Sequence, residues 1–380
     1  MIRQERGFSL VELMITIVIF IMVIAASSQV FTALLTQFKQ QSKIGETDIE
    51  GAIGLDILRR DLTHAGFGLP GNLNGATYQE AGDAWTTFND APNNPPRAVA
   101  TGASPGINGS VLIIKGTNLA VNNACQRWTY ISNRGALSTN LLKSWGTGAG
   151  SQDNFQPGDR VVVMKPNPDP NNRVNILQKS ATGFWTTFAR DISNMDAAFQ
   201  PLANSYESFV MYGIDQDSAL RMPFNRADYY VRRPTTIPQR CAPNTGVLYK
   251  ATVNHSDGSH TELLPVLDCV ADMRVRFCLN TGGVFAIDDG TVVNTLTAAQ
   301  LRDRLQDIQV YIVAQEGQRD NSYDFSNNGV RVGFSPQAFC GSAASQTVNT
   351  ANLSTLVGDP DYKQFRWRLY TIVARPISLR

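Results

Sequence analysis

The clearest catalytic pattern in the chain is GASPG at residues 102–106, which has the glycine and serine spacing of the nucleophile elbow of serine hydrolases. That elbow needs a strand before the serine, a helix after it, and a backbone N–H on the next residue to stabilise an oxyanion. Pro105 has no N–H, and no apolar strand precedes Ser104. The pattern therefore predicts a turn, and we expect no catalytic residue here.

The three histidines lack the spacing of a metal site. His255 and His260 lie in NHSDGSH, a glycine-containing stretch that fits no zinc pattern, and His64 is far from both in the sequence. No CxxC sequence accompanies them, and the lack of CxxCH excludes a c-type haem. The lack of GxxxxGK followed by Ser or Thr excludes a P-loop ATPase. We expect His255 and His260 to lie in a solvated turn.

Three pairs of aspartates could offer oxygen ligands to calcium. They are Asp215 and Asp217, Asp288 and Asp289, and Asp320 and Asp324. No pair has the spacing of an EF-hand loop, and turns rich in Asp and Asn are common in β proteins. Structural turns are the favoured interpretation and bound calcium is the alternative. We expect no metal and no cofactor, and the chain as a whole predicts no enzyme.

One carboxylate stands out near the N-terminus. Between Arg6 and Lys39 the only charged side chain is Glu12, at the start of about 26 uncharged residues that run from Leu13 to Phe38. As a helix this run is about 39 Å long, which exceeds the roughly 30 Å hydrocarbon core of a bilayer. A signal peptide has a shorter apolar region of about 7 to 15 residues before its cleavage site. The run therefore predicts a transmembrane helix that stays in the protein.

The position of Glu12 has an ordinary explanation, because amide dipoles at a helix start favour negative charge by about 0.3 to 1 kcal/mol. Its neighbours suggest a more specific one. The stretch RGFSLVE, from Arg6 to Glu12, resembles the processing site of type IV pilins and of the pseudopilins of type II secretion. The resemblance implies a leader of residues 1–7, removed between Gly7 and Phe8 by a prepilin peptidase that also methylates the new amine of Phe8.

The resemblance also implies a role for the carboxylate. An unpaired charge buried in a bundle of helices costs several kcal/mol, so the side chain needs an opposite charge once the helices assemble. In this family the partner is the terminal amine of a neighbouring pilin, which implies that Glu12 pairs with Phe8 of another subunit. One departure is that Ser27, Ser28 and Gln29 stand where many major pilins have a helix-kinking proline, which puts that kink in doubt.

The helix is expected to continue beyond the membrane. We divide it into residues 8–38, the transmembrane and filament-core part, and residues 39–65, an amphipathic part whose apolar residues recur at spacings of three and four. Gly45, Gly51 and Gly54 each weaken a helix by about 1 kcal/mol relative to alanine. We therefore expect one helix that ends near Thr63 and frays near its glycines.

The rest of the chain, residues 66–380, predicts a β-rich periplasmic head. Residues 66–110 are rich in Gly, Asn and Pro and indicate a long irregular connection. Short apolar runs bounded by turn residues follow, with the best alternation in ADMRVRFCL at 271–279, and TAAQLRDRL at 297–305 indicates a short helix with a capping box. The expected fold class is α+β: a long N-terminal helix packed on a globular head of antiparallel β-sheet, in one or two β lobes.

The cysteines bear on the compartment of the head, and the net charge bears on nucleic-acid binding. All five cysteines follow the apolar run, which suits the periplasm; they are Cys125, Cys241, Cys269, Cys278 and Cys340. Two bridges and one free thiol can be drawn in about fifteen ways. Cys269 and Cys278 are close enough in sequence to clip a local turn and strand. The net charge is +1, and the basic residues near the end predict a solvated strand face, so we expect no nucleic-acid partner.

The order of several loose motifs in the head, from FQPGDRVVVM to ELLPVLDCVADMRVRF and the final FRWRLYTIVARPISL, resembles that of a PilW-type minor pilin. The resemblance implies a non-enzymatic subunit that helps to prime type IV pilus (fimbrium) assembly and sits at or near the tip. Its partners would be other major and minor pilins, the prepilin peptidase and methyltransferase, and the inner-membrane assembly platform. It would cross the inner membrane once, with its head in the periplasm, before it enters the pilus.

Two alternatives stay open. A minor pseudopilin of type II secretion would carry the same N-terminal motif. A membrane-anchored periplasmic enzyme or receptor would keep the apolar helix as an ordinary anchor, and its head would then show an activity or bind a ligand.

Overall fold

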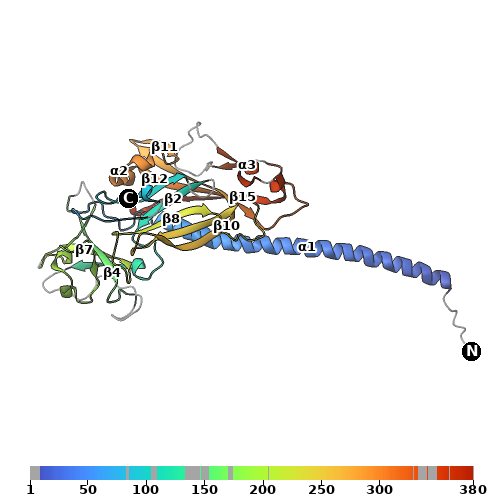
Figure 1. The fold of residues 1–380 in the computed structure, drawn as a ribbon, viewed down its shortest axis with the longest axis horizontal. Helices are drawn as coiled ribbons and strands as arrows, with labels where there is room; N and C mark the ends of the chain where they lie inside the picture. Colours follow the sequence, from blue (N-terminus) through green and yellow to red (C-terminus); the bar gives the residue numbers. More distant parts are fainter. Residues whose placement is uncertain are drawn as a thin grey trace, which may run out of the picture.

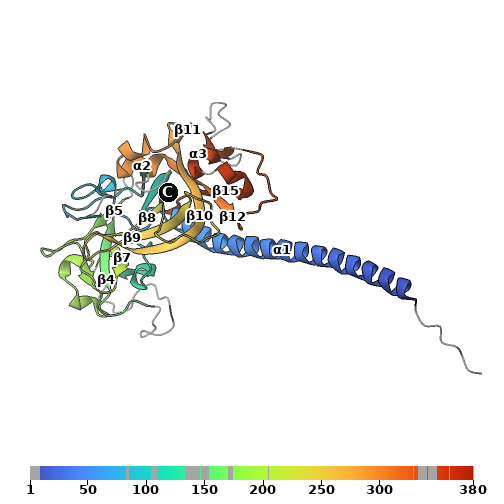
Figure 2. The ribbon, with the colours of Figure 1, turned by 45° about the vertical axis from the view of Figure 1, so that its right-hand side comes forward.

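The computed structural model describes residues 9–82, 85–103, 109–132, 146, 154–169, 174–203, 205–327, 329–332, 340, 349–358 and 360–379. Its largest single element is helix α1, which runs without a break over 54 residues from Leu10 to Thr63. Figure 1 and Figure 2 both show α1 as a gently curved rod whose first half projects from the head and whose last turns lie against it. The expected fraying at its glycines was wrong, and the helix also continues through Ser27, Ser28 and Gln29.

The head is built mainly on an eight-stranded antiparallel sheet, with β11 paired to β10 beside the path β1-β2-β8-β9-β10-β12-β15. Its strands are β1 (Val99–Ala103), β2 (Ser110–Gly116), β8 (Asn225–Arg232), β9 (Gly246–Val253), β10 (His260–Thr281), β11 (Val284–Asp288), β12 (Leu305–Glu316) and β15 (Arg366–Ala374). β10 is 22 residues long, so its first half pairs with β9 and its second half with β12.

A second sheet has five strands, in the order β3-β7-β4-β5 with β6 beside β4. They are β3 (Trp128–Ser132), β4 (Arg160–Pro166), β5 (Asn175–Leu177), β6 (Thr186–Thr187) and β7 (Ser208–Asp215). A small pair joins β13 (Gly329–Val332) to β14 (Asn349–Asn352). The predicted fold class is confirmed: a long N-terminal helix and a head of antiparallel sheets, with the second sheet set to one side of the first (Figure 1).

Short helices connect the strands. The α-helices are α2 (Ala298–Arg304) and α3 (Leu353–Val357). The 3₁₀ turns are η1 (Thr86–Phe88), η2 (Ala124–Gln126), η3 (Ile192–Asn194), η4 (Ala197–Phe199), η5 (Val293–Thr295), η6 (Pro360–Gln364) and η7 (Ile377–Leu379). The predicted capping box of α2 is confirmed, because the Thr297 hydroxyl accepts from the Gln300 amide and the Gln300 side chain accepts from the Thr297 amide. The alternation predicted in β10 is also confirmed: its alternate apolar residues from Met273 to Leu279 enter the main core.

The irregular connection after α1 packs tightly through buried charges. Lys115 of β2 lies 2.7 Å from Glu80 and 2.6 Å from Asp90, both on that connection. Arg226 of β8 contacts Glu80 at 3.3 Å and Asp228 at 2.8 Å. Although burial disfavours charge on Asp90, Lys115 and Arg97 hold its pKa below the usual value. A buried network of this kind fixes the path of a segment that has little regular structure of its own.

His255 is buried and the side chain of His260 is nearly covered, so the prediction that both are solvated was wrong, although residues 255–257 do form a turn. His255 is 5% exposed, its Nε2 lies 3.1 Å from Asn225 Oδ1, and its Nδ1 accepts from the Arg221 amide at 3.2 Å. The His260 side chain lies 2.9 Å from Asp228. Each histidine pairs with a buried polar group on β8 or beside it, and this pairing explains why both lie inside the head. The seven residues of NHSDGSH alone give no sign of these partners.

Helix α1 meets the head along one stripe of its last five turns. Thr47, Gly51, Gly54, Leu58, Asp61 and Leu62 are its buried residues. They recur every three or four positions and so form one helix face. Leu58 and Leu62 are fully buried in the main core, while a Cβ atom on Gly51 would lie 3.2 Å from Leu267 of β10. A Cβ atom on Gly54 would overlap the carbonyl oxygen of Val266. These two glycines allow the helix backbone to approach the sheet, a role that the prediction of fraying did not anticipate.

We predict that Gly54→Ala lowers the free energy of unfolding by about 1 to 3 kcal/mol, because the new methyl group must push α1 away from Val266. The matched control is Gly45→Ala, since a Cβ atom on Gly45 would have no neighbouring atom within 4 Å. That change should stabilise the helix by up to about 1 kcal/mol. Urea unfolding of the full chain in detergent, followed by tryptophan fluorescence, measures both. Equal stability of the two variants would contradict this packing.

We also predict a loss of stability in mild acid that depends on His255. Burial lowers the pKa of His255 to about 4, from an ordinary value of 6.5. The unfolded chain therefore binds a proton at His255 more readily than the folded chain does. The neutral histidine contributes fully to the free energy of unfolding above about pH 6.5. This contribution, up to about 3 kcal/mol, is lost as the pH falls toward 4. His255→Gln, which keeps a donor for Asn225, should show a shallower decline over this range in urea unfolding at successive pH values. Parallel declines would contradict the assignment.

Candidate functional site: the N-terminal segment and the helix–head joint

The first described residue, Ser9, caps helix α1 together with Glu12. The Ser9 hydroxyl accepts from the Glu12 amide at 3.2 Å, and Glu12 Oε2 accepts from the Ser9 amide at 3.1 Å. In a single chain, Glu12 therefore serves as the third residue of a capping box. The predicted processing residues Gly7 and Phe8 lie outside the described residues. The capping bond nevertheless holds the carboxylate at the amide of Ser9, the residue next to Phe8.

The first half of α1 presents apolar side chains to its surroundings on all sides. Phe20, Phe31 and Phe38 are 66%, 62% and 69% exposed, and the aliphatic residues between Leu10 and Leu35 are similarly uncovered. Within the described part of the chain, α1 alone is long and apolar enough to cross a membrane. An apolar surface of this size needs a lipid or protein cover, since water exposure costs free energy in proportion to the area.

The hydroxyl groups of the threonines within this apolar run are satisfied inside the helix. Thr16 donates to the Leu13 carbonyl at 2.8 Å, and Thr32 and Thr36 donate to the carbonyls of Ser28 and Thr32 at 3.0 and 2.9 Å. Bonds of this kind let a threonine lie in an apolar medium without an unpaired donor. The first half of α1 is therefore suited to lipid or to a dry bundle of helices.

A buried ionic contact anchors the other end of α1. Asp61 Oδ2 lies 2.6 Å from the Lys250 ammonium of β9 and accepts from the Tyr229 hydroxyl of β8, also at 2.6 Å. Burial together with Asp61 raises the pKa of Tyr229 well above its usual value, so the phenol stays a donor. Breaking such a pair strands a charge in the core, which typically costs about 3 to 5 kcal/mol. The helix is thereby tied to the middle of the large sheet.

Two further ion pairs hold the part of α1 that lies closer to its exposed apolar half. Arg368 of β15 lies 2.9 Å from Asp48, and Arg240, between β8 and β9, lies 2.9 Å from Glu50. Each involves at least one half-exposed side chain, so each is expected to contribute about 0 to 1 kcal/mol. Because these ion pairs flank the buried stripe of α1, they fix the orientation of the helix on the head and add little to the free energy of unfolding.

The structure pairs four of the five predicted disulfide candidates, all of which lie among the described residues. Cys241 bonds to Cys269 and Cys278 bonds to Cys340, with Cα separations of 5.0 and 5.6 Å. The predicted clip between Cys269 and Cys278 was wrong. Both lie in β10, where an extended backbone places residues nine apart at about 30 Å, far beyond the reach of a disulfide.

Cys125 is the remaining, free cysteine, and it is buried. Its Sγ lies 3.0 Å from the carbonyl oxygens of Ala120 and Asn122. Burial raises the pKa of this thiol to about 11. Such a thiol is a poor nucleophile, because only the thiolate reacts.

The other predicted candidates do not gather into a site. Ser104 and Pro105 lie outside the described residues. Strand β1 (Val99–Ala103) ends directly before Ser104, so the expectation that no strand precedes this serine was wrong. Asp288 accepts from the amides of its own turn, and Asp320 accepts from Ser322 and Arg366. No group of three His, Cys, Asp or Glu side chains that could hold a metal is found among the described residues.

The packing of α1 on the head was predicted, but sequence reasoning missed the polar and ionic contacts that hold this joint. Asp61 and Tyr229 are 168 residues apart, and Asp48 and Arg368 are 320 apart, so no local pattern connects them. One signal was present: Asp61 lies on the same helix face as Leu58 and Leu62, where a carboxylate must find a buried partner.

Comparisons with known proteins agree with the N-terminal motif. Residues 2–28 match the family described as the prokaryotic N-terminal methylation motif. No curated protein sequence matches the chain. Among solved structures, it is similar to the type IV-like pilin TTHA1219 from Thermus thermophilus, at 11% identity, over 88% of this chain and 98% of that chain, with a TM-score of 0.31. That score describes a loose resemblance.

The match falls on the same residues that carry the predicted processing site and the start of α1. The motif, the long apolar helix and the β-rich head thus occur in the predicted order along the chain. The segment on which the resemblance to type IV pilins rests is thus matched independently: this chain carries a prokaryotic N-terminal methylation motif over residues 2–28.

Proposed function

We propose that this protein is a structural, non-enzymatic minor pilin of a type IV pilus. The observation that carries the proposal is the methylation motif at residues 2–28, which leads into an apolar helix that no described part of the chain covers. A prepilin peptidase removes residues 1–7 on the cytoplasmic side and the new amine of Phe8 is methylated. The helix then holds the protein in the inner membrane with its head in the periplasm.

Assembly transfers the helix from lipid into a bundle with other pilins. The apolar surface from Leu10 to Phe38 is covered in either setting, so the transfer exposes little of it to water. The carboxylate of Glu12 leaves the membrane interface and needs a cation, which the terminal amine of a neighbouring pilin supplies. The capping bond to Ser9 is then exchanged for, or shared with, that ion pair.

The size of the head supports a minor rather than a major subunit. The head spreads to both sides of the end of α1 that it covers (Figure 2), which suits a tip position where close lateral packing is not required. We propose that the protein helps to prime assembly there, through contacts with other pilins and the assembly platform. A minor pseudopilin of type II secretion shares the motif, and recovery from sheared pili distinguishes the two.

The first prediction from this proposal concerns the mature N-terminus. Intact-mass and peptide spectra of the protein from its native cells should show a chain that begins at N-methylated Phe8. Gly7→Ala should keep Met1, because the residue before the cut is changed, whereas the neighbouring Ser9→Ala should still be processed. Recovery of residues 1–7 on protein from assembled pili would refute the proposal.

The second prediction separates the two roles of Glu12. Glutamine at this position can still complete a capping box but carries no charge. If the charge pairs with a neighbouring pilin, Glu12→Gln and Glu12→Ala should both reduce recovery in sheared pili at least about tenfold, as expected for an amine left without a partner in a bundle. Membrane insertion should stay normal in both. Wild-type recovery of Glu12→Gln with loss only in Glu12→Ala would show that Glu12 is a helix cap alone.

A further inference from the structure

Strand β10 contains an irregular segment, residues 265–270, that we call the β10 bend. The register between β10 and β9 shifts between Pro265 and Leu267 and again between Leu267 and Val270. Within the bend, Cys269 has φ of 53°, a left-handed conformation that is unfavourable for most residues other than glycine. Surrounding contacts must therefore hold the bend in this shape.

The β10 bend is also the surface on which α1 rests. Gly54 approaches the Val266 backbone and Gly51 approaches the Leu267 side chain. Asp268, the next residue, lies 3.1 Å from Arg240 Nη2, and the same nitrogen lies 2.9 Å from Glu50 of α1. A change in the shape of the bend would therefore move the contacts of Gly51, Gly54 and Glu50 with the head.

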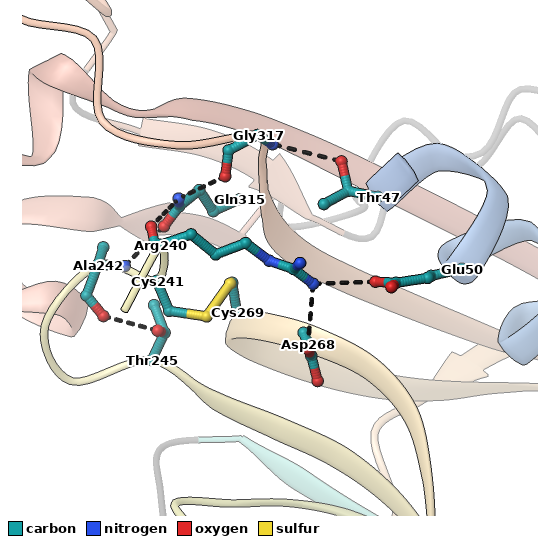
Figure 3. The surroundings of a disulfide bond; sticks show 10 residues. All are labelled: Thr47, Glu50, Arg240, Cys241, Ala242, Thr245, Asp268, Cys269, Gln315 and Gly317. Atoms are coloured by element: carbon teal, nitrogen blue, oxygen red, sulfur yellow. Dashed lines mark hydrogen bonds and ion pairs between the residues drawn. A yellow bond between two sulfur atoms is a disulfide. The ribbon is translucent and has the colours of Figure 1, made fainter. Parts of the chain in front are cut away.

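The loop that supplies Arg240 is fastened on both sides of that residue. Gln315 of β12 donates to the Arg240 carbonyl at 2.7 Å and accepts from the Ala242 amide at 2.6 Å. Cys241, between them, is bonded to Cys269 of the bend. Figure 3 shows that the disulfide and Gln315 both lie beside the backbone of Arg240. From there the Arg240 guanidinium extends toward Glu50 of α1.

We propose that Cys241 and Cys269 form an oxidative modification site that locks α1 to the head. Oxidation joins the two sulfurs, and the two protons and two electrons that the thiols lose pass to a thiol–disulfide oxidant, such as oxidised glutathione or an oxidoreductase carrying a disulfide. The new bond fixes the β10 bend and holds Arg240 between Glu50 and Asp268. In the dithiol form the bend relaxes, and the helix stripe from Thr47 to Gly54 loosens.

The second disulfide supplies a matched control. Cys278 lies opposite Asp307 of β12 and Ile287 of β11, at the far end of β10 from the bend. Its partner Cys340 lies beside Ala286. Removal of this bond should affect the β11 end of the sheet and leave the helix seat in place. The lock depends only on the folded chain, so it holds whether or not the protein enters a pilus.

The test is hydrogen exchange, read by mass spectrometry, on the full-length protein in detergent at pH 7. Cys241→Ser with Cys269→Ser should speed exchange of α1 amides in residues 47–54 about tenfold, because local opening sets the rate. Cys278→Ser with Cys340→Ser should leave those amides at the native rate. Arg240→Gln should loosen the same residues, and its effect should not multiply with that of the first cysteine pair, because both act through one contact.

Graded reduction of the unmodified protein covers the case in which a variant does not fold. Alkylation and peptide mass spectrometry give the fraction of Cys241–Cys269 opened, and exchange at residues 47–54 in the same samples should rise with that fraction. Native exchange of the helix after this bond opens would overturn the proposal. So would an equal acceleration caused by opening Cys278–Cys340, which would indicate general loosening of the head, or fully multiplicative effects of Arg240→Gln and the cysteine pair.

Discussion

The structure depends on the close approach of α1 to the β10 bend. Gly54 lies against the Val266 backbone with no room for a side chain, and Leu58 and Leu62 on the same face enter the main core. Asp61 then closes the contact with a buried ion pair to Lys250. Because packed interiors deform little, this face sets both the depth and the direction of the helix. The exposed half of α1 is consequently presented as a fixed rod.

The other end of the rod holds Glu12 in a role that depends on its surroundings. A helix cap of this kind contributes about 1 kcal/mol, and a solvated carboxylate pays no penalty for its charge. In a dry bundle of helices the same carboxylate is destabilising by several kcal/mol unless a cation is near. The capping geometry seen in the single chain and the ion pair proposed for the filament are thus compatible, since each belongs to a different environment.

Local patterns in the sequence predicted the fold class well. The apolar run, the alternation in β10 and the capping box of α2 are each encoded over a short stretch of neighbouring residues, and each is present in the structure. The N-terminal motif is also local, and the match over residues 2–28 agrees with it. Features of this kind follow from helix and strand periodicity and need no knowledge of the tertiary fold.

Three of the failed predictions involve partners distant in sequence. His255 was expected in solvent, but it fills a polar site beside Asn225, 30 residues away. The helix was expected to fray near Gly54, because the low helix propensity of glycine can be read from the sequence and the contact with Val266 cannot. Cys269 was matched with its nearest cysteine, although a continuous strand keeps the two apart. In each case tertiary packing overrides a correct local rule.

In the proposed filament, Glu12 of one subunit meets the terminal amine of another. Carbodiimide coupling tests this contact directly, because the reagent joins a carboxylate and an amine that are already in contact. In sheared pili we expect a peptide in which the Glu12 side chain is linked by an amide bond to the N-terminus of a second pilin chain. Pili in which Glu12 is captured only by an amine added to the solution would contradict it.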